Sequence, residues 1–502
     1  MSVSSLKTAN EVITITAQEI CGACAGELLT GPQLAPVTSV STDTRVNLGG
    51  SLFVALRGEN FDGGDFAPDA LAKGAMGVVA EAGAARRLAA GFQPGGSQDP
   101  DTVVISVADA GQALKQIASL VASRSEAAVI AITGSTGKTS TKDILFSLLE
   151  KQLPAVASRA SFNNEVGVPL TLLAITPETE VAVVEMGMQA PGEISELCQI
   201  AAPQIAIITN IGPAHLEYSG SLENIARGKS QIAQRLRASG ALVAPYGEQL
   251  LEPYVSGLEA RVITFGFDPA ADVHTVDHER LEDGRLSCTL SCLGEEVDIC
   301  FNFAARHHLL NAMAAIAAYQ FVGLPLAPVV EVAGRLNLPA MRGELVALPG
   351  GGTLLNDCYN ANPLSMRSSL EYLKAVGRGR RTVAVLGDMG ELGPDSPDWH
   401  LEVGSAVSGL NVDCLIAVGE LAAGYVEGAR KAGNGREYHH FTDRQAALAA
   451  IPSLIQQDDV VLVKASRFMK LEQLSEALMA GAAGTSGGAA AVSGPDFLAE
   501  NL

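Results

Sequence analysis

A glycine-containing loop between an apolar run and a helical pattern constrains this chain more than any other segment. The run is A127-A128-V129-I130-A131-I132-T133, the loop reads G134-S135-T136-G137-K138-T139-S140, and apolar residues then recur at helical spacing over 141–149. A continuous apolar run bounded by glycine indicates a parallel strand buried on both faces of a sheet. Backbone N–H groups at the start of the following helix would face an anion. The segment therefore predicts a nucleotide phosphate site.

The loop departs at one position from the common pattern G-x-x-x-x-G-K-[ST]. The first glycine of that pattern is replaced by Ile132, five residues before Gly137. The second glycine, the lysine and the threonine of the pattern are present, and two of these side chains would contact the ligand. Lys138 would neutralise phosphate oxygens, and the Thr139 hydroxyl would hold Mg²⁺. The alternative is a structural turn that carries a solvated lysine.

Strand-like and helix-like segments alternate along the chain, which predicts an α/β protein. A chain of 502 residues suggests about three domains at roughly 150 residues each. We expect blocks at 1–125, 126–335 and 336–480. They are followed at 481–502 by a Gly/Ala/Ser-rich tail, which we expect to be disordered.

The three blocks differ in their expected sheets. The first has strand-like segments at 51–56 and 103–107 and a helical stretch at 66–75. In the second, buried-type strands at 181–184, 205–209 and 241–243 predict a doubly wound parallel sheet. Residues 260–303 alternate in shorter periods and are expected to add antiparallel strands, and 309–319 predicts a tightly packed helix. In the third, apolar runs at 353–357, 382–386, 415–418 and 460–463 predict a Rossmann-type sheet.

Composition excludes several classes of partner. The net charge is -21, from 34 basic and 55 acidic residues, which argues against nucleic acid or an anionic membrane as a bulk partner. No run of 18 apolar residues occurs, and the first residues do not resemble a signal peptide, so we expect a cytoplasmic protein without membrane insertion. The pair Cys21 and Cys24 permits a redox or zinc interpretation, but no second close pair exists to complete a zinc site. We interpret the pair as packing residues of a short helix.

Two further polar residues follow buried strands. Glu185 ends the strand at 181–184, at the carboxyl edge where α/β sheets bind ligands, and suits a metal ligand beside a triphosphate. The alternative is a surface carboxylate. His215 lies beyond the strand that ends at Thr209. Taken alone, this histidine is more typical of a turn residue than of a ligand.

Four segments of the second block resemble the central domain of the Mur ligases, which build the peptide stem of bacterial peptidoglycan. They read TGSTGKTS at 133–140, SFNNEVGVPLTLL at 161–173, VVEMGMQAPGEI at 183–194 and TNIGPAHLEYSGSLENIARGKSQI at 209–232. The phosphate loop of this family also lacks the first glycine and follows T-G-[ST]-x-G-K-T-[ST], so Ile132 fits the family pattern.

Motifs of the first and third blocks resemble the branch of the family that adds D-alanyl-D-alanine. They include STDTR at 41–45, GGSLFVALRG at 49–58, RGE at 342–344, NDCYNANPLSM at 356–366 and VLGDMGELG at 385–393. The D-N-P-R motif of the ligase that adds the third stem residue is absent from the sequence. The resemblance covers about 30–475.

The resemblance implies that ATP is the nucleotide and that two Mg²⁺ ions accompany it. The phosphate loop would comprise Gly134, Ser135, Thr136, Gly137, Lys138, Thr139 and Ser140. Thr139, Glu185 and His215 match metal ligands, and Lys229 matches a lysine that CO₂ carbamoylates. A carbamate would give Mg²⁺ an anionic oxygen ligand where an ammonium would repel it. Catalytic roles are implied for Lys138, Lys229, His215 and Arg342.

Further matches concern the nucleotides and the substrate. Asn311 would lie near adenine, Arg342 would reach the γ-phosphate and Asp357 would bind ribose. The uridine nucleotide would contact Thr42, Asp43, Thr44 and Arg45, and the muramoyl peptide Asn163 and Asn164. Two family glycines are replaced, by Ala305 and by Ala465, which raises the question of whether either turn needs a positive φ.

The implied reaction joins D-alanyl-D-alanine to the terminal carboxylate of UDP-MurNAc-tripeptide through an acyl phosphate, in a protein that we expect to be a monomer. Another Mur-type ligase, adding diaminopimelate, lysine or glutamate, is the alternative. A phosphate-loop ATPase that couples hydrolysis to motion and a non-catalytic binding protein explain fewer of these residues. The sequence leaves open whether the third stem residue is L-lysine or meso-diaminopimelate, and which group acts as the general base.

Overall fold

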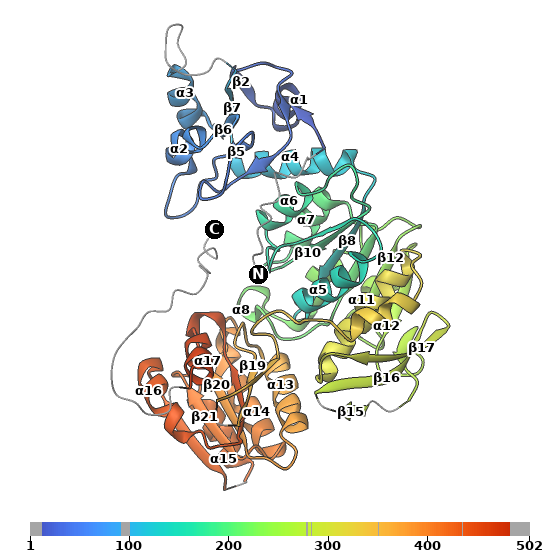
Figure 1. Cartoon of the computed structure of the whole chain (residues 1–502), viewed down its shortest axis with the longest axis vertical. Helices are drawn as coiled ribbons and strands as arrows, with labels where there is room; N and C mark the ends of the chain where they lie inside the picture. Colours follow the sequence, from blue (N-terminus) through green and yellow to red (C-terminus); the bar gives the residue numbers. More distant parts are fainter. Residues whose placement is uncertain are drawn as a thin grey trace.

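The computed structural model describes residues 13–91, 101–277, 280–282, 284–349, 351–433 and 435–481. Within them the chain forms three α/β domains, each built on its own sheet, as the sequence predicted. The central domain lies between the other two (Figure 1). The tail expected beyond Gly481 lies outside the described residues.

The N-terminal sheet has five strands in the order β2-β7-β6-β5-β4. These are β2 (Glu27–Thr30), β4 (Val40–Ser41), β5 (Leu52–Val54), β6 (Gly77–Glu81) and β7 (Val103–Val107). β2 is antiparallel to β7, and the other pairs are parallel. The accompanying helices are α1 (Ala17–Cys24), α2 (Ala67–Ala72) and α3 (Ala82–Ala90).

Helix α1 settles the interpretation of the paired cysteines. Thr16 and Glu19 form a reciprocal capping box at its start, and Cys24 is buried at its end. All eight cysteines of the chain are free thiols. Burial raises the pKa of Cys24 to about 11, so this thiol stays protonated near neutral pH. The prediction that the pair packs a short helix is confirmed.

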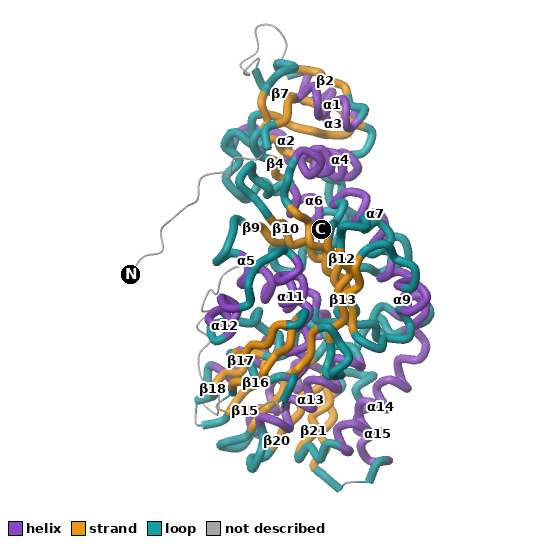
Figure 2. The backbone as a smooth tube through the Cα atoms, turned by 90° about the vertical axis from the view of Figure 1, so that its right-hand side faces the viewer, coloured by secondary structure: helices purple, strands orange, loops and turns teal. Residues whose placement is uncertain are grey.

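Helix α4 (Ala110–Arg124) connects the first two domains. Its buried face, which includes Leu114, Ile117 and Val121, belongs to one hydrophobic core that takes in Ile105 of the N-terminal sheet and Val129 of the central sheet. Figures 1 and 2 both show α4 between the N-terminal strands and helices α6 (Gly167–Leu172) and α7 (Glu193–Ala201). The shared core joins these two domains through apolar packing.

The central sheet contains the predicted buried strands. Its parallel part runs β14-β13-β12-β11-β8-β10-β9. Along β8 (Ala128–Thr133), Val129 and Ala131 face one core and Ile130 and Ile132 face the other, the alternation of a strand buried on both sides. The remaining parallel strands are β9 (Ala155–Ala157), β10 (Val181–Glu185), β11 (Ile205–Ile208), β12 (Ala241–Pro245), β13 (Arg261–Phe265) and β14 (Val273–Thr275).

The prediction for residues 260–303 was correct only in part. β13 pairs in parallel with β12, so the parallel sheet extends further than expected. The antiparallel strands are β15 (Arg280–Glu282), β16 (Arg285–Cys292) and β17 (Glu295–Phe301). β16 also pairs antiparallel with β14. The parallel pairing of β13 was not predicted, because only alternate residues along this strand are buried. That pattern resembles a strand with one solvated face, which is typical of antiparallel sheets.

Helices α5 (Lys138–Leu149), α11 (Arg306–Phe321) and α12 (Ala327–Ala333) cover one face of the central sheet, and α4, α6, α7 and α9 (Leu222–Ser230) cover the other. α11 is buried along nearly its whole length, in line with the small-residue pattern that predicted it.

The C-terminal sheet has the order β18-β19-β23-β20-β21-β22. Its strands are β18 (Glu344–Ala347), β19 (Thr353–Asn356), β20 (Thr382–Gly387), β21 (Cys414–Val418), β22 (Glu437–Phe441) and β23 (Val460–Lys464). β18 is antiparallel and the other five are parallel, so their carboxyl ends share one edge. Helices α13 (Pro363–Val376), α14 (Ser396–Gly409) and α15 (Ala423–Lys431) pack on one face, and α16 (Arg444–Leu454) and α17 (Glu472–Met479) on the other.

No helix in the described part of the chain is long and apolar enough to cross a membrane.

Candidate functional site

The loop between β8 and α5 requires glycine at two positions. Gly134 has a φ of +151°, and a Cβ atom there would lie 1.8 Å from Thr209 Oγ1. Gly137 has a φ of +80°, and its Cβ would lie 2.3 Å from Asn311 Oδ1. Both sites therefore combine a backbone conformation that favours glycine with the close approach of a neighbouring side chain. Asn311, expected near the base of the nucleotide, lies directly against the loop.

Loop residues Ser135 and Thr136 are fixed by the segment that follows β11. Ser135 Oγ donates to Gly212 O at 2.8 Å and accepts from Gly212 N–H at 2.9 Å. Asn210 Oδ1 accepts from Thr136 N–H at 3.0 Å, and Asn210 Nδ2 donates to Thr136 Oγ1 at 2.9 Å. These bonds hold the shape of the loop before any ligand arrives, an arrangement suited to binding an anion with little reorganisation.

Lys138 begins α5 and folds back over the loop. Its Nζ donates to Gly134 O at 2.8 Å. Burial lowers its pKa, while the nearby carboxylate of Glu185 opposes that shift and the Arg342 guanidinium adds to it. The expected metal ligand Glu185 and Arg342, expected at the γ-phosphate, are thus both close enough to Lys138 to influence its charge. Thr139 and Ser140 are buried in the first turn of α5.

Glu185 is buried at the end of β10, next to β8 in the sheet. Its Oε1 accepts from Asn163 Nδ2 at 2.8 Å, whereas its Oε2 is buried and has no hydrogen-bond partner. An unpaired buried carboxylate oxygen is costly, and a cation beside it would remove that cost. The structure thus joins Glu185 to Asn163, two residues expected at different ligands. Asn164 instead points its Oδ1 at the N–H of Gly167, 2.9 Å away, at the start of α6.

Lys229 lies on α9 with 1% of its surface exposed. Burial lowers its pKa well below that of a free lysine, and the positive charge of Lys138 lowers it further. No carboxylate pairs with Lys229 in the part of the chain that the structure describes. A buried cation without a partner is unfavourable, so this position suits an amine whose charge is removed.

His215 adopts a left-handed conformation, with φ of +57°, immediately before the short helix α8 (Leu216–Ser219). Its Nδ1 lies 2.5 Å from Oε2 of Glu391, a residue of the C-terminal domain. The close approach of His215 lowers the pKa of the Glu391 carboxyl. The contact leaves Nε2 as the ring atom that faces away from this carboxylate.

Arg342 and Tyr359 bring the C-terminal domain to the phosphate loop. The Arg342 guanidinium lies over the Tyr359 ring, 3.9 Å from its centroid, and the Tyr359 hydroxyl forms a short hydrogen bond with Ser161 Oγ of the central domain. Ser161 belongs to the same loop as Asn163. This contact places the Arg342 cation at the interface between the two domains.

Asp357, expected at the ribose, forms a partly buried ion pair with Lys464. Its Oδ2 accepts from Lys464 Nζ at 2.8 Å, and the Ser369 hydroxyl donates to the same oxygen. Lys464 also donates to Asn360 O at 3.0 Å. Of the two replaced glycines, Ala305 has a φ of -83° and Ala465 is absent from the residues with positive φ. Alanine is therefore compatible with the backbone at both positions.

The loop with Thr42, Asp43, Thr44 and Arg45 follows β4 in the N-terminal domain. The Arg45 guanidinium pairs with the Asp43 carboxylate at 2.9 Å, and Lys73 Nζ donates to Thr44 O at 2.7 Å. These bonds order the loop locally. The loop lies in the N-terminal domain, whereas the phosphate loop and Glu185 lie in the central domain.

Family models match all three domains of the chain. The model described as "Mur ligase family, catalytic domain" matches residues 36–121, "Mur ligase middle domain" matches 132–319, and "Mur ligase, glutamate ligase domain" matches 341–467. The chain is also 34% identical over 443 residues to UDP-N-acetylmuramoyl-tripeptide--D-alanyl-D-alanine ligase of Bacillus subtilis, covering 88% of this chain and 93% of the relative. The chain belongs to the Mur ligase family.

Other members of the family resemble this chain over nearly its whole length. The enzyme of the same name from Escherichia coli is 33% identical over 475 residues, which cover 93% of this chain and 99% of the relative. The crystal structure of MurF from Acinetobacter baumannii superposes with a TM-score of 0.82 at 30% identity, covering 94% of this chain and all of the other. MurF ligase from Thermotoga maritima in complex with ADP superposes at 0.75, with 25% identity, over 90% of this chain and 98% of the other.

Sequence reasoning gave no role to several residues that hold the site together. Lys142, with 2% of its surface exposed, donates to Ser158 O and Ala160 O, both at 2.7 Å, and so fixes the loop that leads to Asn163. Asn210 and Glu391 lie within the family motifs and Lys464 directly precedes Ala465, but the sequence assigned none of the three a role. Lys142 lies about one helical turn after Lys138, where its position beside the phosphate loop was the available signal. Its burial is unusual, since lysine is rarely buried without a partner.

Proposed function

We propose that this chain is an ATP-dependent ligase that joins D-alanyl-D-alanine to the terminal carboxylate of UDP-MurNAc-tripeptide, giving UDP-MurNAc-pentapeptide for peptidoglycan synthesis. The observation that carries the proposal is the assembly of Lys138, Glu185 and Arg342 between the central and C-terminal domains. Relatives that cover 88% and 93% of the chain bear the name of this activity.

ATP would bind with its phosphates on the loop from Gly134 to Ser140. Free N–H groups at the start of α5 and the Lys138 ammonium would face the β- and γ-phosphates. Asn311, next to Gly137, would contact the base, and Asp357 the ribose. A relative of similar fold was crystallised in complex with ADP, which supports the binding of an adenine nucleotide by this chain.

Two Mg²⁺ ions would fit the oxygen and nitrogen atoms of the site. Thr139 and Glu185 would hold the first ion, and the unpartnered Oε2 of Glu185 fits that role. His215 and a carbamoylated Lys229 would hold the second, because a carbamate replaces an unpaired buried cation by an anionic oxygen ligand. When bound, the ions would neutralise charge on the transferred phosphoryl group.

The chain's own residues would act by positioning and by electrostatics. The tripeptide carboxylate attacks the γ-phosphorus, the bond to ADP breaks, and Lys138 and Arg342 stabilise the charge on the phosphoryl oxygens. The amine of D-alanyl-D-alanine, after losing a proton, attacks the acyl carbon of the resulting acyl phosphate, and phosphate leaves. Because Arg342 comes from the C-terminal domain, closure of this domain would complete the site.

We assign one ligand-binding role to each of the three domains. We propose that 1–125 binds the uridine nucleotide through Thr42, Asp43, Thr44 and Arg45, that 126–335 binds ATP, and that 336–480 closes over it. Asn163, already bonded to Glu185, and Asn164 would contact the muramoyl peptide. The protein would act as a monomer in the cytoplasm, where ATP and UDP-linked precursors are available.

A panel of amines tests the proposed specificity. The protein is incubated with ATP, Mg²⁺ and one of D-alanyl-D-alanine, diaminopimelate, lysine or glutamate. Each amine is offered with UDP-MurNAc-tripeptide and, separately, with the UDP-MurNAc-peptide that lacks the third residue, and the products are identified by mass spectrometry. We expect UDP-MurNAc-pentapeptide to form with D-alanyl-D-alanine and no product to form with the other three amines. A product from one of the other amines, with none from the dipeptide, would assign the chain to another branch of the family. Supplying the tripeptide with lysine or with diaminopimelate at its third position would show which acceptor is preferred.

A further inference from the structure

The amino edge of the C-terminal sheet carries three neighbouring side chains of the kinds that bind metal ions. They are Cys414 at the start of β21, and Glu437 and His439 on β22. Each offers one ligand atom, and the three atoms lie within 4.8 Å of one another. None of the three side chains takes part in the proposed reaction.

The pairing of β21 with β22 brings these side chains together. The two strands are parallel, and Cys414 is directly opposite Glu437 in their register. Side chains that are opposite each other in a sheet share a face, and so do those two positions apart on one strand, such as Glu437 and His439. All three therefore lie on one face of the sheet, which is the face covered by α16.

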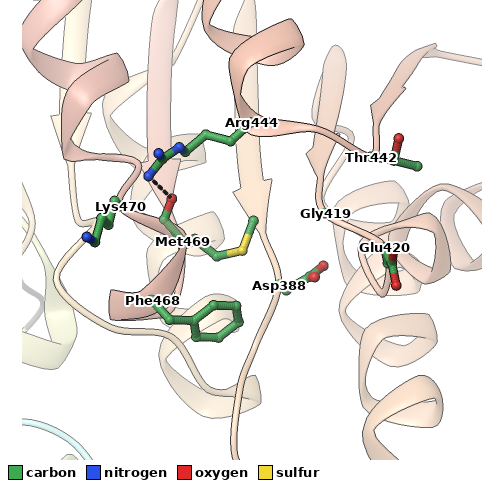
Figure 3. A pocket seen from close by; sticks show the side chains of 8 residues that line it. All are labelled: Asp388, Gly419, Glu420, Thr442, Arg444, Phe468, Met469 and Lys470. Atoms are coloured by element: carbon green, nitrogen blue, oxygen red, sulfur yellow. Dashed lines mark hydrogen bonds between the residues drawn. The ribbon is translucent and has the colours of Figure 1, made fainter.

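The cluster is remote from the candidate catalytic site. The carboxyl edge of the same sheet carries a pocket of about 410 Å³ lined by loop residues such as Asp388 and Phe468 (Figure 3). Glu391, which contacts His215, also follows β20 at that edge. Because β21 is five residues long, the two edges are roughly 13 Å apart. A metal ion at Cys414 would therefore have a structural role.

An anchored arginine orients the Glu437 carboxylate. Arg381 Nη2 donates to Glu437 Oε2 at 2.7 Å, and Arg381 Nη1 donates to Asp459 Oδ2 at 2.6 Å. Asp459 is buried, so the guanidinium is held on its inner side. Glu437 Oε1 is left for the cluster, where it lies 2.8 Å from His439 Nε2. Outer hydrogen bonds of this kind hold metal-binding carboxylates in place.

The ligand types favour Zn²⁺ over the Mg²⁺ expected beside ATP. Zn²⁺ accepts cysteine sulfur, histidine nitrogen and carboxylate oxygen together, whereas Mg²⁺ requires oxygen ligands. Zinc bond lengths of about 2.0–2.3 Å place tetrahedral ligand atoms roughly 3.5 Å apart, so small side-chain movements would close the cluster around the ion. Because Asp459 balances Arg381, one thiolate and one carboxylate would match the charge of a divalent cation.

The cluster has an open side for the entry of an ion. Cys414 is buried, whereas Glu437 is exposed and His439 is partly exposed. No hydrogen bond engages the Cys414 sulfur within the part of the chain that the structure describes. An entering ion would displace the thiol proton, bind the thiolate and keep a water molecule as its fourth ligand.

We propose that Cys414, Glu437 and His439 bind a structural Zn²⁺ ion that ties β22 to β21. β22 is the last strand in the order of the sheet, and its two polar ligands would then be bridged to the buried thiol of its neighbour. Such a bridge would stabilise the edge of the C-terminal domain. This inference is independent of the proposed ligase reaction.

Titration with Co²⁺ tests the site, because a cobalt–thiolate bond gives a charge-transfer absorption band that oxygen and nitrogen ligands do not. The reduced full-length protein, freed of metal with a chelator, is titrated with Co²⁺. We expect the band to appear in the unmodified protein, to be lost in Cys414→Ser, and to require at least about tenfold more Co²⁺ in His439→Gln. Cys300→Ser, which changes a partly exposed thiol on β17, is the matched control and should keep the band.

The outcomes that would overturn the site are equally specific. A band that persists in Cys414→Ser would place the ion at other thiols, such as the pair Cys21 and Cys24. The absence of a band from the unmodified protein would exclude a thiolate site. If Cys414→Ser does not fold, an unaltered titration of His439→Gln would overturn the proposal.

Thermal unfolding with added Zn²⁺ supplies a second readout. An ion that binds only the folded state raises the Tm, so the unmodified protein and Cys300→Ser should gain more from Zn²⁺ than His439→Gln does. Equal gains in all three proteins would show that Zn²⁺ acts elsewhere. The rate of phosphate release with Mg²⁺ should be the same in His439→Gln as in the unmodified protein, and a lower rate would contradict a purely structural role.

Discussion

Nδ1 of His215 in the central domain lies 2.5 Å from Oε2 of Glu391 in the C-terminal domain. The backbone joins the two domains at the same point, since Glu217 N–H donates to Glu391 O at 3.1 Å. Glu391 also adopts a φ of +60°, an uncommon conformation for a residue with a side chain. A carboxylate that holds one nitrogen of a histidine fixes the ring and presents the other nitrogen to a ligand.

Replacing Glu391 therefore tests whether this contact orients His215. We expect Glu391→Gln to lower kcat by about 10- to 100-fold and to weaken Mn²⁺ binding, measured by electron paramagnetic resonance with an ATP analogue present. Glu402→Gln, which removes an exposed ion pair with Arg367 in the same domain, is the control and should change neither quantity. Unaltered metal binding in Glu391→Gln would show that the contact only joins the domains.

Alanine at the glycines of the phosphate loop should abolish nucleotide binding. In Gly134→Ala the new Cβ meets Thr209, and in Gly137→Ala it meets Asn311, so the loop must move. Gly247→Ala is the matched control, since Gly247 also has a positive φ, +72°, but no heavy atom within 4 Å of the added Cβ. We expect isothermal titration with ADP to detect binding in the control and none in the loop variants. Normal affinity in either loop variant would contradict the assignment of this loop.

Carbamoylation of Lys229 can be observed directly. In buffer with ¹³C-labelled bicarbonate we expect one protected carbamate resonance in the ¹³C spectrum of the unmodified protein. The resonance should be lost in Lys229→Ala, together with at least about 100-fold of kcat. Lys151→Gln changes an exposed lysine of the same domain and should keep both the resonance and the activity. A resonance that persists in Lys229→Ala would place the carbamate on another amine.

The buried histidine at the domain interface should make stability depend on pH. Burial lowers the pKa of His308 well below its ordinary value. Below about pH 6.5 the unfolded state takes up a proton that the folded state excludes, so stability falls as the pH decreases. We expect His308→Phe, whose ring would remain beside Phe303, to reduce the slope of unfolding free energy by up to about 1.4 kcal/mol per pH unit below about pH 6. Urea titrations across this range measure the slope, and an unchanged slope would assign the pH dependence to other groups.

The sequence predicted the parts of the fold that local patterns encode. Strands buried on both faces, such as β8 and β10, appear as continuous apolar runs, and α11 appears as a run of small residues. β22 was not predicted, because its sequence EYHHF has no apolar run and the strand lies at the edge of the sheet. An edge strand is partly solvated, so its composition resembles that of a loop.

The residues of the candidate site also divide into those that a local motif reveals and those whose partners lie far away in the sequence. Gly134, Lys138 and Thr139 form one local motif, which the sequence reveals without knowledge of tertiary contacts. The bonds from Asn163 to Glu185 and from Lys464 to Asp357 join residues 22 and 107 positions apart. Such partnerships depend on how loops meet at sheet edges, and no spacing rule encodes them. The resemblance to a family located the residues, and the structure supplied their partners.

The release of phosphate from ATP shows whether this chain couples ATP cleavage to the joining of its two substrates. The protein is mixed with ATP, Mg²⁺ and UDP-MurNAc-tripeptide, with and without D-alanyl-D-alanine, and phosphate and nucleotide products are measured together. We expect sustained release only when both substrates are present, with one UDP-MurNAc-pentapeptide formed per phosphate. Release at the same rate without either substrate, and without pentapeptide, would show that the chain is not this ligase and would identify the loop at 134–140 as part of a general ATPase.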